Sequence, residues 1–132
     1  MLYEIFFEEG VEHARVVLSG RVTVNGMLDV LDALTTDGTL FPKKRLLDTR
    51  DCELVLSSVE LKQIADMGKS RDAASTNSRI AVLVSSDLNF GISKIYEAHR
   101  ESDNHEVRVF RSESDALAWL TEVVDGDCPA ES

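Results

Sequence analysis

Four consecutive residues carry the most chemically versatile side chains of this sequence. Asp48, Thr49, Arg50 and Asp51 directly follow an apolar run, and a guanidinium between two carboxylates can form a polar recognition loop. The same residue types are also common in turns, where Asp and Arg satisfy backbone amides and each other. We therefore keep both interpretations, a recognition loop and an internally satisfied turn, and count the four residues as candidate binding residues.

Two pairs of serines precede expected helices, Ser57-Ser58 and Ser85-Ser86. A hydroxyl at the start of a helix caps unpaired backbone N–H groups, and the same position can bind an anion or accept a phosphate. Plain N-capping explains these serines equally well. Ser57 and Ser58 are kept as candidate binding or modification residues.

The other reactive side chains form no catalytic or metal-binding pattern. Cys52 is the one plausible nucleophile, but Asp51 and Glu53 beside it disfavour a thiolate through like-charge repulsion. No glycine-rich nucleotide loop and no GxSxG motif are present. The histidines fall in three different expected elements: His13, His99 and His105. We expect no enzyme activity, no catalytic residue, no metal and no cofactor.

Composition places the chain among ordinary soluble proteins. A net charge of −10 and a pI near 4.6 disfavour nucleic-acid binding and anionic lipid surfaces. The longest apolar run, residues 80–84, is far shorter than the about 20 residues that cross a bilayer. The acidic N-terminus is unlike a secretory signal, and Cys52 and Cys128 are expected to be free thiols. These features indicate a cytoplasmic protein without membrane insertion.

Apolar runs and capping signals predict alternating strands and helices. The expected strands lie at residues 2–8, 13–19, 44–48, 79–84 and 106–111. The expected helix starts are Thr23 or Asn25, Ser57 with Glu60, Ser86, and Ser112 with Asp115. Asp37-Gly38 should end the first helix, and residues 49–56 should form the longest connection. Residues 1–124 are predicted as one domain and residues 125–132 as an acidic flexible tail.

Alternation of this kind predicts a largely parallel sheet covered by helices, because parallel neighbours need crossover connections. A short turn between the first two strands makes them a hairpin. We therefore expect an α/β sandwich with a five-stranded mixed sheet, the first strand antiparallel at the edge, and four helices. Ligands of open α/β sheets gather beyond the carboxyl ends of the parallel strands, where residues 48–51 are expected.

The third expected helix carries a second group of candidates, Phe90, Gly91 and Tyr96. Its inward side chains are expected to be Leu88, Ile92, Ile95 and Tyr96. Because glycine weakens a helix, Gly91 suggests that another element packs closely there. This element is either a helix of the same chain or of a second copy, or else a small apolar ligand lies between the second and third helices.

Several segments together resemble a known family. They are RIAVLVS at 79–85, DLNFG at 87–91, IYEA at 95–98, EVRVFR at 106–111 and DALAWL at 115–120. In this pattern the chain resembles the SpoIIAA-like group of bacterial proteins, which is related in fold to STAS domains and more distantly to Sec14-type lipid-binding domains. The resemblance covers most of the chain, is strongest in its second half, and is specific for fold rather than function.

The resemblance also directs attention to the junction between the third strand and the second helix. STAS-type anti-sigma-factor antagonists carry a phosphorylatable Ser or Thr there, in an Asp-Ser-Ser/Thr-Gly-type motif. Here the junction runs from Asp48 to Ser58, is longer and more acidic, and has no Gly after Ser57 and Ser58. This departure argues against a direct anti-sigma-antagonist role.

The sequence therefore predicts a non-enzymatic cytoplasmic protein-interaction or regulatory module. We expect a homodimer that also contacts a regulatory protein partner and binds no nucleic acid. Its signal would pass through the junction after the third strand and through the Phe90 face of the third helix. The alternative is a binder of a small apolar or lipid-like ligand in a Sec14-like pocket.

Overall fold

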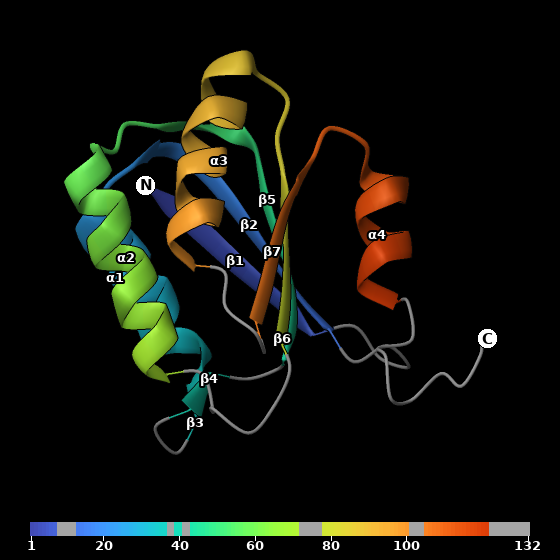
Figure 1. Ribbon diagram of the computed structural model, residues 1–132, viewed down its shortest axis with the longest axis horizontal. Coiled ribbons are helices and arrows are strands. Elements are labelled where there is room, and N and C mark those ends of the chain that lie inside the picture. Colours follow the sequence, from blue (N-terminus) through green and yellow to red (C-terminus); the bar gives the residue numbers. More distant parts are fainter. Residues whose placement is uncertain (8–12, 37–38, 41–42, 72–77, 101–104, 122–132) are drawn as a thin grey trace.

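A five-stranded mixed sheet forms the centre of the molecule (Figure 1). The computed structural model describes residues 1–7, 13–36, 39–40, 43–71, 78–100 and 105–121. The strands, in their order across the sheet, are β1 (Leu2–Phe7), β2 (His13–Val22), β5 (Lys44–Leu54), β6 (Ser78–Leu83) and β7 (His105–Phe110). β1 pairs antiparallel with β2, and all other pairs are parallel. The predicted sheet, with its antiparallel edge hairpin, is confirmed.

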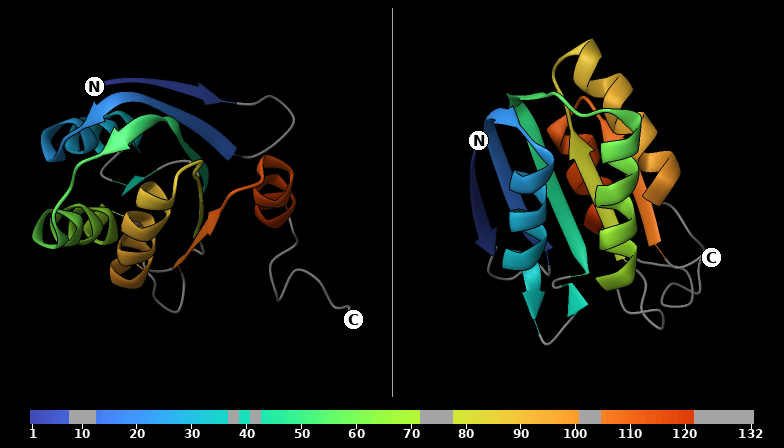
Figure 2. Two further views of the ribbon diagram at one scale, coloured as in Figure 1. Left: turned by 90° about the horizontal axis from the view of Figure 1, so that it is seen from above. Right: turned by 90° about the vertical axis from the view of Figure 1, so that its left-hand side faces the viewer.

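Helices cover the two faces of the sheet unequally. The four helices are α1 (Val24–Leu34), α2 (Ser58–Arg71), α3 (Asp87–Arg100) and α4 (Glu113–Thr121). Figure 2 shows α1, α2 and α3 on one face and α4 on the other. A further hairpin of two short strands, β3 (Thr35–Thr36) and β4 (Thr39–Leu40), follows α1 and was not predicted.

The first two helices begin where the capping signals place them. Thr23 is the N-cap of α1, and its Oγ1 accepts a hydrogen bond from the Gly26 N–H at 3.1 Å. Ser57 and Glu60 form the predicted capping box of α2. The Ser57 N–H donates to Glu60 Oε1 at 2.9 Å, and the Glu60 N–H donates to Ser57 Oγ at 3.1 Å. Local sequence therefore determines these boundaries.

The core lies on both faces of the central strands. β6 is buried at all six positions, as predicted for a strand covered on both sides. The largest cluster packs β2 and the end of β5 against α1 and α2. Its buried members are Ala14, Val16, Leu18, Val22, Met27, Val30, Leu31, Leu34, Leu54 and Ile64. A second cluster lies under α4, and a third lies under α3.

Strand β5 is longer than predicted, and this is the main correction to the fold. Residues 49–54 continue the strand instead of starting a long connection. The reason is the neighbouring strand: β2 runs on to Val22, and after a register shift between Val17 and Ser19 it pairs with residues 51–54 of β5. A bulge of this kind changes the local register and lets pairing continue. The candidate residues 48–51 thus lie within a strand, not beyond its end.

The inner face of α3 also differs from the prediction. Leu88 and Ile95, expected to point inward, are 60% and 42% exposed. The buried positions are Asn89, Ser93 and Arg100, with Ile92 and Tyr96 partly buried beside them. Compared with the prediction, α3 is rotated about its axis so that Asn89 and Ser93 face the sheet. Asn89 faces inward because it forms hydrogen bonds with backbone groups at the end of β5.

Some expectations fall on residues outside the described ranges. These are Glu8 in the first strand, the Asp37-Gly38 helix end and the tail at 125–132. Within the described ranges, no helix is both long and apolar enough to cross a membrane.

Candidate functional site

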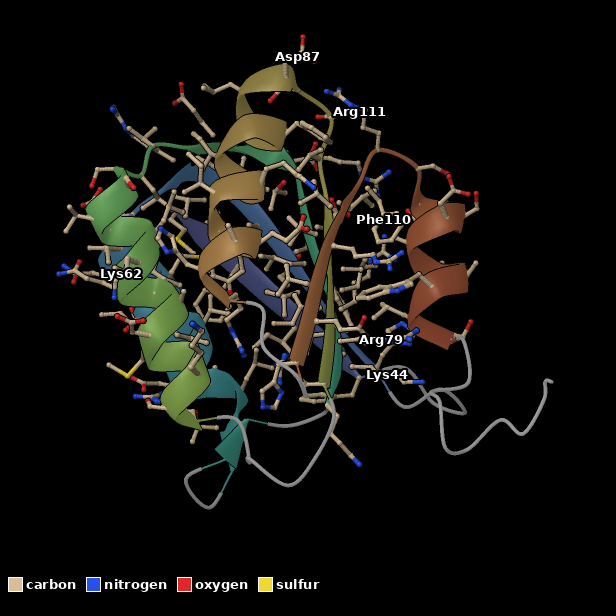
Figure 3. The ribbon with its side chains drawn as sticks, in the orientation of Figure 1. Lys44, Lys62, Arg79, Asp87, Phe110 and Arg111 are labelled. Atoms are coloured by element: carbon tan, nitrogen blue, oxygen red, sulfur yellow. The ribbon has the colours of Figure 1, made fainter. Side chains whose placement is uncertain are left out.

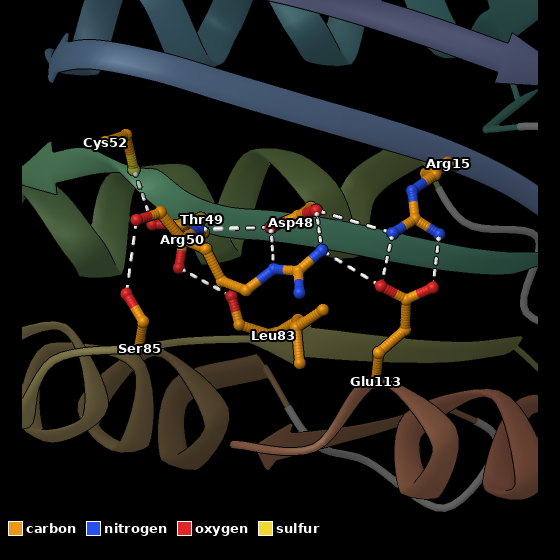
Figure 4. A network of polar contacts seen from close by, with 8 residues as sticks. All are labelled: Arg15, Asp48, Thr49, Arg50, Cys52, Leu83, Ser85 and Glu113. Atoms are coloured by element: carbon orange, nitrogen blue, oxygen red, sulfur yellow. Dashed lines mark hydrogen bonds and ion pairs between the residues drawn. The ribbon is translucent and has the colours of Figure 1, made fainter.

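Two arginines and two carboxylates form a closed network on the α4 face of the sheet (Figure 4). Arg50 donates from Nε to Asp48 Oδ1 at 3.0 Å and from Nη2 to Asp48 Oδ2 at 2.9 Å. The same Nη2 reaches Glu113 Oε1 at 2.9 Å. Arg15 donates to Glu113 Oε1 at 3.0 Å and lies 3.4 Å from Asp48 Oδ2. Each arginine therefore contacts both carboxylates.

The charges in this network hold one another in the ionised state. Burial raises the pKa of Asp48, but hydrogen bonds from Arg50 and the positive charges of Arg50 and Arg15 outweigh it, so the pKa lies below its ordinary value. A hydrogen bond from Arg15, helped by Arg50, lowers the pKa of Glu113. The hydrogen bond that Arg50 donates to Asp48 raises the pKa of Arg50. The network is therefore neutral as a whole, and neither carboxylate is suited to act as a base at neutral pH.

The network partly matches the pattern seen in the sequence. Arg50 does lie between two carboxylates, but the second is Glu113 at the start of α4, 63 positions away, and not Asp51. Asp51 is exposed. Asp48 Oδ1 also accepts from the Arg50 backbone N–H at 3.1 Å, so Asp48 and Arg50 satisfy each other locally. No sequence pattern links Arg15 or Glu113 to Asp48, because only the fold brings these residues together.

Thr49 and Asn89 join the inner side of β5 to its neighbours. Thr49 is fully buried, and its Oγ1 donates to the Leu83 carbonyl of β6 at 2.8 Å. Asn89 Nδ2 donates to the carbonyls of Thr49 at 3.2 Å and Cys52 at 3.0 Å, while its Oδ1 accepts from the Leu54 N–H at 3.2 Å. Thr49 is therefore structural. Sequence analysis missed Asn89 because Leu88 beside it was placed on the inner face.

The environment of the Cys52 thiol disfavours its charged thiolate form. Burial, followed by the negative charges of Asp48 and Asp51, raises the pKa of Cys52 to about 12. Its Sγ donates to the Thr49 carbonyl at 3.3 Å. The expectation of a raised thiol pKa agrees with this result, although burial contributes more than the neighbouring acids on which the expectation rested.

Beyond β5, three large apolar side chains are exposed where α2 and α3 begin. Val55 is 40% exposed, Val59 71% and Leu88 60%. We call Val55, Val59 and Leu88 the rim patch. The hydrogen bond between Leu54 and Asn89 joins the end of β5 to the start of α3, next to Val55 and Leu88, and Figure 1 shows α2 and α3 starting at the same edge of the sheet. The exposed Ser57 and Ser58 lie beside this patch at the start of α2.

The candidates on α3 are arranged differently from the expectation. Phe90 is partly buried, and the Arg111 guanidinium lies 4.6 Å from its ring centroid. Tyr96 is also partly buried and packs on two core clusters. No element of the described chain packs closely on Gly91, because a Cβ there would meet no atom within 4 Å, whereas packing by a second copy or a ligand stays a prediction.

Close helix packing occurs at Gly68 of α2 instead. A Cβ at this position would lie 2.9 Å from Nε of the fully buried Arg100 of α3. Glycine therefore lets α2 and α3 approach each other over the arginine side chain.

Comparison with solved structures supports one conclusion about the fold. A crystal structure of an uncharacterized protein of the DUF3478 family from Shewanella loihica PV-4, which has a SpoIIAA-like fold, superposes with a TM-score of 0.60. The two chains are 15% identical, and the superposition covers 90% of this chain and 92% of the other. The chain has a SpoIIAA-like fold. No protein-family model and no curated protein matches the sequence.

The SpoIIAA-like fold of this chain has a small, partly open apolar cavity between the sheet and the helices α2 and α3. Its volume is about 30 Å³, and Leu18, Leu47, Ile64 and Tyr96 are among the residues that line it. One water molecule needs about 10–15 Å³ of such space, so the cavity has room for about two water molecules and not for a lipid chain. A ligand larger than this would have to separate α2 and α3 from the sheet.

The described part of this SpoIIAA-like chain contains no group of three or more His, Cys, Asp or Glu side chains placed to hold a metal ion. Of the histidines, His13 and His105 are buried, and they are the first residues of β2 and β7. His105 Nδ1 shares a hydrogen bond of 2.7 Å with Ser78 Oγ. Internal contacts thus hold Asp48, Thr49, Arg50 and His105, whereas Asp51 and Ser58 are exposed.

Proposed function

We propose that this chain is a non-enzymatic protein-interaction module, and that the rim patch is its contact surface. The observation that carries the proposal is the exposure of Val55, Val59 and Leu88 at one edge of the sheet. Large apolar side chains exposed at one edge can serve as a contact surface, since leaving them in water is unfavourable. This edge lies beyond the carboxyl ends of β5 and β6, where open α/β sheets bind their partners.

The state of the nearby polar groups supports a non-enzymatic role. Asp48 and Glu113 are ionised and paired with arginines, and the Cys52 thiol stays protonated at neutral pH. None of the three is prepared for proton transfer or nucleophilic attack. A partner protein, by contrast, needs only apolar contact at the rim patch.

Regulation would act at Ser58. The Ser57 hydroxyl is occupied in the capping box, whereas Ser58 is exposed in the first turn of α2 and precedes Val59. A phosphate at a helix N-terminus is favoured by the helix dipole, and here it would add charge beside the rim patch and weaken apolar binding. Native mass spectrometry of protein from its source cells would detect one added phosphate, which Ser58→Ala should abolish and Ser57→Ala should not.

The rim patch can be tested by removing its apolar character. The double variant Val59→Lys with Leu88→Lys should stay folded, because both side chains are largely exposed. Capture from source cells should then lose the proteins that bind the wild-type chain. Ile95→Lys is the matched control, since Ile95 is an exposed apolar residue of the same helix α3 outside the patch. Equal capture by all three proteins would contradict the proposal.

A small apolar ligand is the second candidate, and the cavity under α2 and α3 is the observation that favours it. Its volume of about 30 Å³ requires the helices to open before a lipid-like molecule can enter. Native mass spectrometry under gentle conditions tests this candidate directly. An apolar ligand retained by the wild-type chain and displaced by Ser93→Leu, which fills the cavity wall, would favour ligand binding over the rim patch.

A further inference from the structure

Strand β1 is an open, apolar edge of the sheet. It has β2 as its one neighbour in the described sheet, so the opposite side of its backbone has no strand to pair with. Its exposed large side chains are Leu2 at 74%, Tyr3 at 38%, Phe6 at 46% and Phe7 at 59%. Proteins normally protect an edge strand with Lys, Pro, a bulge or a covering element. The six residues of β1 contain no Lys or Pro, and Glu4 is their single charge.

We propose that β1 pairs antiparallel with β1 of a second copy of this chain, which joins two five-stranded sheets into one dimer. This inference goes beyond the rim patch and does not depend on it. A second copy is the partner that fits, because one strand can meet its own image across a two-fold axis with the same surface on both sides.

The geometry of a two-fold axis limits the possible registers. Tyr3, Ile5 and Phe7 of β1 share the face of their β2 partners Leu18, Val16 and Ala14, which belongs to the main core. Leu2, Glu4 and Phe6 lie on the opposite face. In a continuous antiparallel sheet the axis stands perpendicular to the sheet, so residues of one face meet residues of the same face. The axis must therefore pass beside a residue and not between two.

Charge then selects between the two registers with the longest overlap. An axis beside Glu4 would place the two Glu4 carboxylates opposite each other, and like charges directly opposite are destabilising. An axis beside Ile5 places Ile5 opposite the partner's Ile5 and Tyr3 opposite the partner's Phe7. It also places Glu4 opposite the partner's Phe6. The Ile5 register therefore joins apolar residues and moves the two Glu4 carboxylates from directly opposite to diagonal positions.

The first test is the mass of the intact chain in solution. Sedimentation equilibrium should give twice the chain mass of 14.6 kDa at high concentration, with dissociation on dilution. Because each chain carries a net charge of −10, added salt should screen the repulsion between copies and strengthen the dimer. A wild-type chain that stays monomeric at every concentration and salt overturns the proposal.

The second test addresses the register through charge pairs. Tyr3→Lys and Phe7→Glu, each alone, remove both symmetric Tyr3–Phe7 contacts and should weaken the dimer by about tenfold or more. The double variant carrying both changes places opposite charges across the interface and should recover much of the affinity. Circular dichroism confirms that each variant is folded. A dimer unaffected by the single changes, or no recovery in the folded double variant, overturns the register and with it the proposed pairing.

The rim-patch variant serves as the matched control. Val59→Lys with Leu88→Lys should leave the dimer unchanged, and Phe7→Glu should leave capture of partner proteins at the rim patch unchanged. Loss of the dimer in the rim-patch variant would place the second copy there and overturn pairing through β1. The two proposals therefore fail in different experiments.

Discussion

Large apolar side chains are covered at one edge of the sheet and exposed at the other. At β7, α3 packs on one face and α4 on the other, and the ring centroids of Phe110 and Trp119 lie 5.7 Å apart. Figure 3 shows Phe110 and Arg79 on the side of α4. At β1, by contrast, Phe6 and Phe7 are 46% and 59% exposed. The comparison shows that helices of the same chain cover both faces of β7, whereas the large apolar side chains of β1 stay exposed.

Charged residues strengthen this contrast. The guanidinium of Arg79 lies 4.8 Å and that of Arg108 5.4 Å from the Trp119 ring centroid, and Glu106 of β7 pairs with Arg79 at 3.2 Å. The charged residues Glu106 and Arg108 of β7 disfavour further strand addition at this edge. β1 has only Glu4 for this purpose.

The polar network lies at the border between the part of the sheet that α4 covers and the exposed edge at β1. α4 packs on β5, β6 and β7, and its first residue Glu113 reaches Arg15 on β2. Beyond Arg15 on the same face lies Phe6 of β1, its cross-strand partner. On this face, the charged network therefore lies between the strands that α4 covers and the exposed apolar side chains of β1.

The largest expected effect comes from breaking the covered edge. Trp119→Ala should lower the free energy of unfolding by about 3–5 kcal/mol, because it empties a buried site under α4. Trp119 is 7% exposed. Denaturant unfolding measures the change. Phe7→Ala at the open edge is the matched control, measured at a concentration where the chain is monomeric, and should change the free energy by less than about 0.5 kcal/mol. Similar losses at both sites would remove the contrast between the edges.

A smaller effect is expected at the border. Asp48→Asn keeps the size of the side chain but removes the charge that Arg50 and Arg15 share, and it should cost about 1–2 kcal/mol of unfolding free energy. The loss stays below that of a fully buried pair because Arg50 is 38% exposed and water can replace the carboxylate. Asp51→Asn on the same strand is the control. Equal effects of the two changes would argue against a structural role of the network.

Acid should reduce the contribution of the polar network to the free energy of unfolding. The pKa values of Asp48 and Glu113 are lower in the folded chain than their ordinary values of 3.8 and 4.5. Their contribution to stability is therefore complete above the ordinary pKa values and is lost as the pH falls through the folded ones. Urea unfolding between neutral and acidic pH should show a steeper loss below about pH 4.5 in the wild type than in Asp48→Asn with Glu113→Gln. Parallel curves would count against this coupling.

The smallest effect sharpens the account of α3, which covers β7. Gly91→Ala should stabilise the chain by about 0.5–1 kcal/mol, because alanine favours the helix and its Cβ meets no neighbouring atom. Gly68→Ala is the matched substitution on α2 and should destabilise, since its Cβ would press on the buried Arg100. Thermal or urea unfolding distinguishes the two. A destabilised Gly91→Ala would mean that another element does pack on this position.

Local patterns were sufficient for the order of elements but not for their extent. The capping box at Ser57 and Glu60 lies within one helical turn, so four residues determine it. The length of β5 depends on its pairing partners in β2, residues 19–22, which lie 32 positions earlier, so the sequence of β5 alone reads as a loop after Asp48. Hydrophobic periodicity also placed Leu88 wrongly on the buried face of α3. That face is determined by the hydrogen bonds of Asn89 with β5 as well as by hydrophobicity.

The sequence by itself determined the alternation of strands and helices, the antiparallel hairpin at one edge and the starts of the helices, since neighbouring residues carry all of these signals. The tertiary structure alone decided that Asp48 and Arg50 meet Arg15 and Glu113, and that Gly68 and not Gly91 lies at a close helix contact. It also decided that β1 keeps an apolar edge while β7 is covered. These features depend on which distant segments become neighbours, and a local pattern of polarity carries no information about that.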